Sequence, residues 1–183
     1  MRVIAGVARG VPLAAPRDRG TRPITDRVKE TLFGILNERV LDARVLDLYA
    51  GSGAIGIEAL SRGASHATFV ERNRQAVGVI GSNLERTGLA DRATVRPMDV
   101  MRFLASASAS AAQGSAYDLA FLDPPYQERA ILAPLEGLVP LLAPEATVVV
   151  KHFWRTEVPP LEGLRPWRER RFGETALTFL EVP

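Results

Sequence analysis

The sequence predicts an α/β fold, a doubly wound and mostly parallel sheet that ends in an antiparallel hairpin. β-type runs alternate with helical segments from residue 44 to residue 153, and this alternation is typical of βαβ units. A glycine-rich stretch joins the first run to its helix, and near the C-terminus two further β-type runs flank a tight-turn signal at residues 172–175. With 183 residues, of which 46% are hydrophobic, the chain can bury the core of one domain.

The N-terminal part divides into an arm and a leading helix. Residues 1–24 are dense in glycine, proline and arginine and predict a basic arm or hairpin, while residues 25–183 predict the main domain, including its leading helix. Thr25 or Asp26 is placed to cap this helix, because a side-chain oxygen there can accept from the free N–H groups of the first turn. Apolar residues recur on one helical face, namely Val28, Leu32, Ile35, Leu36 and Val40.

The alternating elements then follow in order. We expect strands at residues 44–50, 67–71, 93–99, 117–123 and 146–153, and two more in the terminal hairpin, which makes a seven-stranded sheet. Helices are expected at residues 54–63, 73–88, 100–106 and roughly 128–142. The tract at 105–116 consists mainly of alanine and serine, and it predicts a flexible connector.

The composition excludes several kinds of site. The chain has no cysteine, so it forms neither a disulfide nor a thiolate metal site, and with only His66 and His152 as histidines we expect no metal. Chains without disulfides suit the cytoplasm. Residues 1–20 hold scattered arginines instead of an apolar signal core, and no run of about 18 apolar residues could span a bilayer. We therefore expect a cytoplasmic protein without membrane contact.

Charge is distributed unevenly, although the formal net charge is only +2. Residues 1–30 carry six arginines and one lysine against three acids, and residues 151–171 carry six bases against three acids, so the rest of the chain is acidic. Two such basic patches could face a polyanion, because clustered arginine and lysine contact phosphates. A solvated surface explains the same charges equally well, and charge alone does not decide.

The glycine-rich stretch predicts a nucleoside or nucleotide site. Gly51, Gly53 and Gly56 fit the spacing G-x-G-x-x-G between a strand and a helix. Glu71 lies twenty residues after Gly51, at the end of the next strand, where an acid can bind ribose hydroxyl groups. The alternative, that the glycines serve only a tight turn, is weakened by this agreement between loop and acid.

The acids around this loop favour a cationic ligand. Asp47 lies inside an apolar run, where a buried carboxylate needs a partner such as a ligand ammonium. Glu71, Asp99 and Asp123 also fall at strand ends, where open α/β sheets bind ligands. S-adenosylmethionine carries an ammonium and a sulfonium but no phosphate, so it fits these acids better than a nicotinamide dinucleotide does. Glu71 is then expected at the ribose and Asp99 near the adenine amine.

The stretch from Asp123 to Tyr126 predicts a site for a nucleobase amine. Pro124 and Pro125 lack an N–H group and have a fixed φ, so the backbone carbonyls and the Asp123 carboxylate can accept from an amine. Acceptors that hold both amine hydrogens favour a pyramidal nitrogen whose lone pair points at a methyl carbon, and such positioning is worth up to about 7–11 kcal/mol. Tyr126 offers a ring on which the base can stack.

Four stretches, "RPITDRVKETLF", "DLYAGSGAIGIEALSRGA", "FVE" and "FLDPPY", resemble the bacterial RsmD family of 16S ribosomal RNA (guanine-N2)-methyltransferases. The resemblance spans nearly the whole chain and implies a class I S-adenosylmethionine-dependent methyltransferase fold, which is Rossmann-like. It implies a catalytic group that holds the guanine, made of Asp123, Pro124, Pro125 and Tyr126. The cofactor site that it implies consists of Asp47, Tyr49, Ala50, Gly51, Ser52, Gly53, Glu71, Arg72, Asp99 and Asp123.

The resemblance also implies a partner, 16S ribosomal RNA within the small subunit or a late assembly intermediate, and a monomeric enzyme. Thr25 and Glu30 would lie near the cofactor mouth and the RNA. Two positions depart from the family pattern, which more often has threonine at Ile24 and usually has an acid at Lys151. The arginines expected to contact RNA are Arg2, Arg9, Arg17, Arg19, Arg22 and Arg27.

Three alternative functions remain open. A DNA adenine-N6 methyltransferase can carry the same Asp-Pro-Pro-Tyr stretch, but such enzymes usually need a target-recognition insert, and the alanine and serine tract has no basic or aromatic content for that role. A nicotinamide-dependent oxidoreductase would use the glycine loop and leave that stretch unexplained. A ribosome-assembly factor without catalysis would need neither the residues of the cofactor site nor the Asp-Pro-Pro-Tyr stretch.

Overall fold

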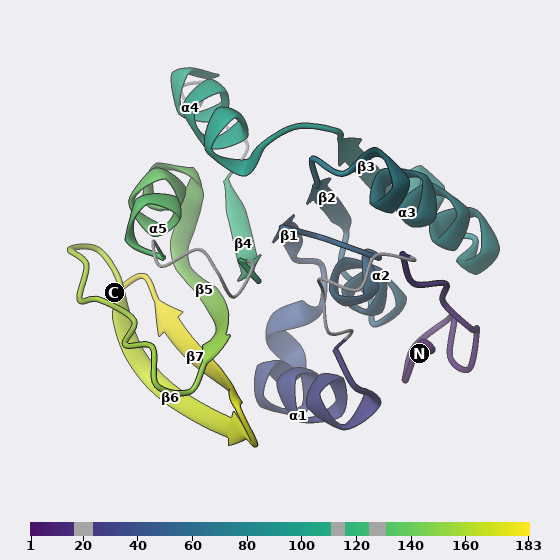
Figure 1. Cartoon of the computed structure of the whole chain (residues 1–183), viewed down its shortest axis with the longest axis horizontal. Helices are drawn as coiled ribbons and strands as arrows, with labels where there is room; N and C mark the ends of the chain where they lie inside the picture. The colour runs from purple at the N-terminus through teal and green to yellow at the C-terminus, as the bar shows by residue number, and fades with distance from the viewer. Residues whose placement is uncertain (17–23, 111–115, 125–130) are drawn as a thin grey trace.

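The computed structural model describes residues 1–16, 24–110, 116–124 and 131–183, and its centre is a seven-stranded sheet (Figure 1). The order is β3-β2-β1-β4-β5-β7-β6; neighbours from β3 to β5 are parallel, and β7 is antiparallel to both β5 and β6. This confirms the predicted sheet and hairpin. The strands are β1 (Arg44–Leu48), β2 (His66–Val70), β3 (Ala93–Arg96), β4 (Tyr117–Leu122), β5 (Leu142–Phe153), β6 (Arg165–Phe172) and β7 (Thr175–Glu181).

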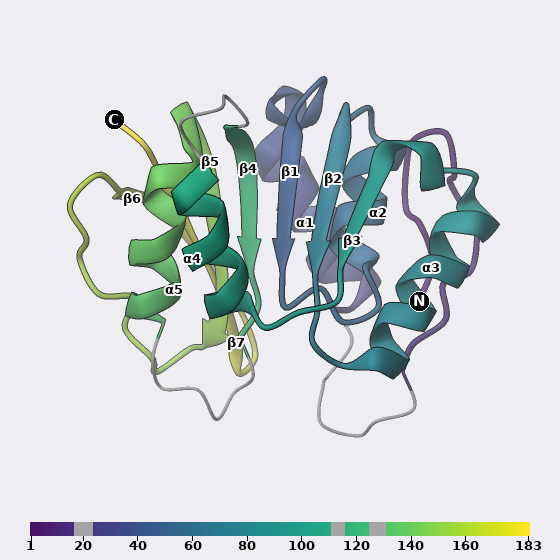
Figure 2. The same ribbon diagram turned by 90° about the horizontal axis from the view of Figure 1, so that it is seen from above.

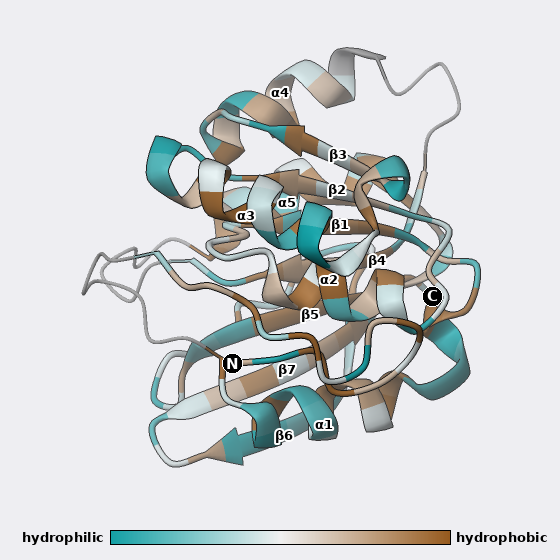
Figure 3. Cartoon of the chain, turned by 90° about the vertical axis from the view of Figure 1, so that its right-hand side faces the viewer, coloured by the Kyte–Doolittle hydropathy of each residue, from teal (hydrophilic) through white to brown (hydrophobic). Residues whose placement is uncertain are grey.

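Helices cover both faces of the sheet, as Figure 2 shows. The buried side chains of α1, α2 and α3 form one hydrophobic cluster with the first face, and those of α4 and α5 form a second cluster with the other. In Figure 3 the central strands β1 and β2 are mainly hydrophobic, while β6 and α1 carry many hydrophilic residues. The helices are α1 (Asp26–Leu36), α2 (Ala54–Ser61), α3 (Arg74–Thr87), α4 (Val100–Ser110) and α5 (Leu132–Leu138), with short 3-10 helices at Asn37–Val40, Ala90–Arg92 and Val139–Leu141.

The prediction of a flexible connector at residues 105–116 is partly wrong, because α4 continues into this tract as far as Ser110. Phe103 and Leu104 anchor the helix in the second cluster, and alanine is the strongest helix former, so the helix extends beyond its packed part. Residues 111–115 of the tract lie outside the described residues. The next helix is shorter than predicted, because the chain turns into a 3-10 helix that contains Pro140 before β5 begins.

The leading helix is confirmed, with Thr25 as its cap. The Val28 N–H donates to Thr25 Oγ1 at 3.4 Å, and Val28, Leu32 and Leu36 are buried as predicted. Lys29 is also completely buried, which its charge did not predict. Its partner is Glu58 of α2, whose carboxylate lies 3.3 Å from Lys29 Nζ with both side chains fully enclosed. A buried cation is tolerated here because it is paired.

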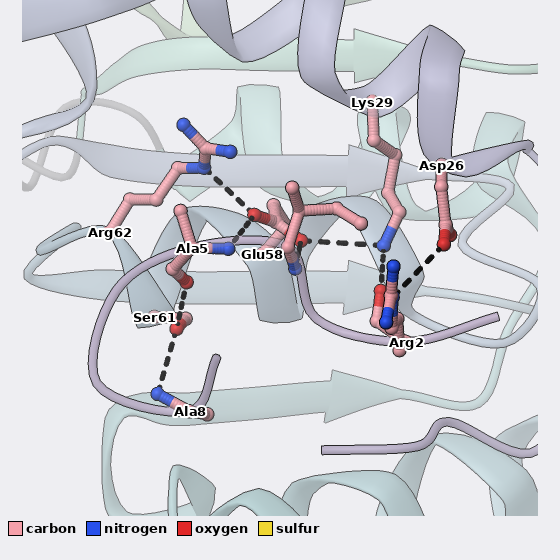
Figure 4. A network of polar contacts seen from close by, with 9 residues as sticks. Arg2, Ala5, Ala8, Asp26, Lys29, Glu58, Ser61 and Arg62 are labelled. Atoms are coloured by element: carbon pink, nitrogen blue, oxygen red, sulfur yellow. Dashed lines mark hydrogen bonds and ion pairs between the residues drawn. The ribbon is translucent and has the colours of Figure 1, made fainter. Parts of the chain in front are cut away.

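The same glutamate holds the N-terminal arm (Figure 4). The Ile4 N–H donates to Glu58 Oε2 at 2.8 Å and the Ala5 N–H donates to Oε1 at 3.0 Å, while Arg62 Nε lies 2.8 Å from Oε1. Lys29 Nζ also donates to the Arg2 carbonyl. The segment predicted as an arm or hairpin folds back on itself, with an antiparallel bridge between residues 2 and 12 and three backbone hydrogen bonds between residues 1–3 and 10–13, and a division into arm and domain stays a prediction. Glu58 thus fixes where the arm and α1 approach the sheet.

Within the part of the chain that the structure describes, no helix is long and apolar enough to cross a membrane.

Candidate functional site

A cavity of about 230 Å³ opens at the edge of the sheet where the parallel strands end. Figure 2 shows the arrowheads of β1, β2 and β4 at this edge. The turn after β1, the end of β2, the start of α4 and the ends of β4 and β5 form its walls, and Ala15, Pro16 and Ile24 contribute to it from the N-terminal segment. Doubly wound sheets bind their ligands at this edge, as the sequence predicted.

The turn from β1 into α2 depends on its glycines. Gly51 has φ 56° and Gly53 has φ 74°, both in the left-handed region that glycine adopts without strain. Tyr49 takes the same region, at φ 59°, with a full side chain. Gly56 has another role, since a Cβ atom there would lie 2.3 Å from the ring of Phe69 on β2. Glycine at this position therefore lets α2 pack closely on the sheet beside the cavity.

Asp47 lines the cavity and is almost fully buried, with 2% of its surface exposed. The sequence predicted a ligand ammonium as its partner, and the structure adds one within the chain, because the Gly56 N–H donates to Asp47 Oδ2 at 3.0 Å. Burial raises the pKa of Asp47 to about 8; the hydrogen bond from Gly56 opposes this rise, and the charges of Asp123 and Glu71 add to it. Near neutral pH the carboxyl group therefore holds a proton that a cationic ligand would displace.

Two other carboxylates organise the backbone around the cavity. Glu71 accepts from the Gly51 N–H at 3.0 Å and from the Asn73 N–H at 2.8 Å. Asp99 accepts from two backbone N–H groups in the first turn of α4, and its Oδ2 lies 3.6 Å from Arg72. Both acids line the cavity, so the strand ends present carboxylates whose positions are fixed by local hydrogen bonds.

These contacts occupy two N–H groups that a pyrophosphate would need. The Gly51 N–H donates to Glu71, and the Gly56 N–H, in the first turn of α2, donates to Asp47. In dinucleotide folds the phosphates sit at this helix N-terminus. Because two carboxylates of the chain stand in that place, the arrangement favours a ligand that is cationic and carries no phosphate.

Asp123 follows β4 and forms an ion pair that the sequence did not predict. Its Oδ2 lies 2.6 Å from Lys151 Nζ on the neighbouring strand β5, and both residues line the cavity. The Lys151 side chain is 9% exposed and the Asp123 side chain 29%. Burial raises the pKa of Asp123, while the charge and hydrogen bond of Lys151 lower it. Lys151 therefore favours an ionised carboxylate at the position where we expected a nucleobase amine.

Nearly all of the residues expected at the cofactor site line this cavity, and so does Pro124. Gly53 does not, because it is buried at the start of α2. Pro125 and Tyr126 fall outside the described residues, so their roles stay predictions. The expected residues in the lining are Asp47, Tyr49, Ala50, Gly51, Ser52, Glu71, Arg72, Asp99 and Asp123.

Sequence reasoning missed part of the lining. Ile24 and Lys151 stood out only as departures from the family pattern, which did not reveal the ion pair. Ala15 and Pro16 carry no local signal at all, since their position depends on Asn83 of α3. The Asn83 side chain accepts from the Ala14 N–H at 2.8 Å and donates to the Ser52 carbonyl at 3.0 Å, which joins the arm to the glycine turn. The other missed residues are Ala54, Ile55, Val70, Asn73 and Val100.

Among the arginines expected to contact RNA, the three that the structure describes lie at two places. Arg2, Arg9 and Arg27 are exposed, and Arg2 lies 3.3 Å from the carboxylate of the first residue of α1. Arg9 lies toward the far end of α2, because the Ala8 N–H donates to Ser61, the last residue of that helix. Arg17, Arg19 and Arg22 fall outside the described residues. RNA contact by this set stays a prediction.

Comparisons with known proteins identify the family of the chain and proteins with a similar fold. Residues 1–181 match the family described as "Conserved hypothetical protein 95". The chain is 40% identical over 182 residues to the protein of Escherichia coli (strain K12) named "Ribosomal RNA small subunit methyltransferase D", a match that covers 96% of this chain and 87% of that protein. A solved structure of a hypothetical protein from Thermus thermophilus is similar with a TM-score of 0.83 and 36% identity, covering 100% of this chain and 99% of that one. The rRNA methyltransferase AviRa of Streptomyces viridochromogenes shares the fold, with a TM-score of 0.70 at 18% identity, over 96% of this chain and 91% of that one.

Proposed function

The chain belongs to the RsmD-like family that its residues 1–181 match, and on that premise we propose that it transfers a methyl group from S-adenosylmethionine to the exocyclic N2 amine of a guanine in 16S ribosomal RNA. The name of the Escherichia coli relative supports the RNA class of the substrate. The observation that carries the proposal is that Asp123, which follows β4, lines the same cavity as Asp47 and Glu71. An acceptor for an amine thus lies beside a site suited to a cationic nucleoside.

The acids of the cavity fit S-adenosylmethionine, which when bound supplies a methyl group made electrophilic by its sulfonium. Asp47 would lose its proton and face the ammonium, because an opposite charge stabilises the ionised carboxyl. Glu71 is engaged with two backbone N–H groups, and the remaining lone pairs of its oxygens can accept from ribose hydroxyl groups. Asp99 would lie near the adenine amine.

Asp123 and the prolines after it would hold the guanine amine. The ionised carboxylate accepts one N–H and backbone carbonyls accept the other, which directs the nitrogen lone pair out of the ring plane. The nitrogen gains a bond to the methyl carbon as the carbon–sulfur bond breaks, and it then gives up a proton, for which the Asp123 carboxylate is an acceptor in place. Lys151 supports the first of these steps, because its charge and hydrogen bond oppose the rise that burial causes in the pKa of Asp123 and so favour the ionised carboxylate.

The proposed substrate is the small ribosomal subunit or a late assembly intermediate, and the proposed enzyme is a cytoplasmic monomer. The exposed arginines of the arm and of α1 would contact RNA phosphates, which gives affinity that depends on salt. The target base would be splayed out of its stack to reach the cavity, as is usual when a protein reads single-stranded RNA.

The structure disfavours two of the three alternative functions and leaves the third to be separated by its substrate. A nicotinamide-dependent oxidoreductase is disfavoured, because the N–H groups of Gly51 and Gly56 donate to carboxylates of the chain. A non-catalytic assembly factor leaves the burial of Asp47 and the ion pair of Asp123 without a purpose. A DNA adenine-N6 methyltransferase shares the same chemistry, so only the substrate separates it from the proposed function.

The test is transfer of labelled methyl from S-adenosylmethionine to three purified substrates, which are small subunits from cells that lack the enzyme, naked 16S RNA and duplex DNA. We expect label mainly in the small subunits. Label in DNA alone would establish the adenine-N6 alternative, and absence of label from all three would reject the proposed function. A chain with Asp123→Ala serves as the control for label that another enzyme introduces.

A further inference from the structure

One tryptophan and two arginines form a cluster beside the cavity, where β5 ends. Trp154 follows Lys151 of the cavity by three residues, so their Cα atoms lie within about 11 Å of each other. The Trp154 N–H donates to the Glu174 carbonyl at 3.0 Å, which ties the end of β5 to the turn between β6 and β7. That turn lies at the cavity edge of the sheet, because Phe153 pairs with Thr175. The cluster is therefore a neighbour of the proposed methylation site.

In this cluster two arginine guanidinium groups lie against the ring of Trp154. The guanidinium groups of Arg155 and Arg171 lie 4.7 and 3.6 Å from the centroid of the Trp154 ring. Arg171 Nε also donates to the Gly173 carbonyl at 2.8 Å, which fixes the direction of its guanidinium. Both arginines are exposed, and across the described ranges of the chain no carboxylate forms an ion pair with either. Two ordered positive charges thus face solvent together.

The neighbouring strand carries further arginines. β6 is an edge strand of the sheet (Figure 1), and Arg168 and Arg170 on it are exposed, but they point to the face opposite Arg171, because successive residues of a strand alternate in direction. Arg165 differs, because it lies 2.6 Å from Glu181 and its charge is compensated. The Trp154 surface, defined as Trp154, Arg155 and Arg171, therefore joins a half-buried aromatic ring to two exposed arginines.

We propose that the Trp154 surface binds the RNA strand that flanks the methylated nucleotide. The inference rests on the proposed function and adds a contact opposite the N-terminal arm. Guanidinium groups bind phosphates through paired hydrogen bonds, and unstacked bases pack on aromatic rings and on guanidinium planes. A positive surface with an aromatic ring is the combination that holds single strands. Because Trp154 already orders two guanidiniums, less side-chain entropy is lost when RNA binds.

The test compares Arg155→Ala/Arg171→Ala with Arg44→Ala in binding to a short single-stranded RNA, over about 50 to 200 mM salt. Arg44 is an exposed arginine at the opposite end of β1, so it controls for loss of charge. We expect the double variant to bind about tenfold or more weakly, and the slope of log affinity against log salt to shrink by about 1.4, which is two phosphate contacts on a single strand. Arg44→Ala should match the wild type.

A second variant separates stacking from charge. Trp154→Ala should weaken binding about fivefold or more, and Trp154→Phe should restore most of the loss. Unchanged S-adenosylmethionine affinity in every variant would show that the cavity is intact. Slopes equal to those of Arg44→Ala would overturn the inference, and so would a loss seen with whole subunits but not with protein-free RNA, since that would indicate a ribosomal protein as partner. These binding data stand even if no methyl transfer occurs, so the two proposals fail separately.

Discussion

Asp47→Asn should make the ligand-free protein more stable and the stability less dependent on pH. In the wild type the pKa of Asp47 is about 8 in the folded chain and 3.8 without burial, so the folded state binds a proton that the unfolded state releases between these values. The free energy of unfolding therefore falls as pH rises through this range, by up to about 1.4 kcal/mol per pH unit. Asparagine carries no charge, and its side-chain oxygen can still accept from Gly56.

The size of the effect follows from the two pKa values. Between pH 5 and pH 8 the unfolding free energy of the wild type should decrease by roughly 3–4 kcal/mol relative to that of the variant. Urea unfolding followed by circular dichroism at several pH values measures this difference. The exposed Asp91→Asn, in the 3-10 helix before β3, is the matched control and should leave the pH dependence unchanged. A parallel pH dependence in wild type and Asp47→Asn would refute the buried, protonated carboxyl.

The same variant tests the role of Asp47 toward a ligand. A cationic ligand should lower the pKa of Asp47 and release its proton, so calorimetry near pH 7 in buffers of different ionisation enthalpy should detect proton release when S-adenosylmethionine binds. Asp47→Asn should bind the cofactor more weakly and release no proton from this position. Proton release that persists in the variant would assign the effect to another group.

The remaining predictions concern the amine side of the cavity and the packing beneath it. Asp123→Ala should abolish methyl transfer while cofactor affinity, measured by calorimetry, largely survives; loss of both would mean that the residue is misassigned. Lys151→Met should move the acid limb of the pH profile of kcat to higher pH, because it removes the cation that lowers the pKa of Asp123, and an unmoved limb would contradict that role. Tyr126→Ala should reduce kcat more than Tyr126→Phe if the ring stacks on the base, whereas equal losses would exclude stacking. Gly56→Ala should lower the unfolding free energy by about 1–3 kcal/mol in urea, because its Cβ would meet the Phe69 ring, and a stability equal to wild type would disprove that close contact.

Much of the architecture could be predicted because its signals are local. Alternation of β-type and helical runs predicted five strands, the turn signal at residues 172–175 predicted the other two, and the glycines at 51, 53 and 56 marked the turn beside the cavity. The meeting of the acids at one cavity could be predicted for the same reason. Parallel strands end at one edge, so Asp47, Glu71, Asp99 and Asp123 had to meet there once the strands were identified.

The parts that were missed depend on contacts between distant residues. Lys29 reads as a surface residue until Glu58, which is distant in the chain, is brought beside it. The ion pair between Asp123 and Lys151 depends on β4 and β5 being neighbours in register, and no local pattern reveals it. The extension of α4 combines a local signal with a distant one, because alanine favours a helix, but the packing of Phe103 and Leu104 that anchors this helix cannot be seen in the sequence.

The central claim is that this cavity directs methyl transfer to a guanine amine, and the most direct measurement is the identity of the methylated nucleoside. Small subunits from cells without the enzyme are treated with the purified protein and labelled S-adenosylmethionine, and the 16S RNA is digested to nucleosides and separated. We predict that the label elutes as N2-methylguanosine and is absent with Asp123→Ala. Label in methyladenosine, in a ribose-methylated nucleoside or in a ring-nitrogen product would contradict the assignment of Asp123 as the acceptor for the guanine amine.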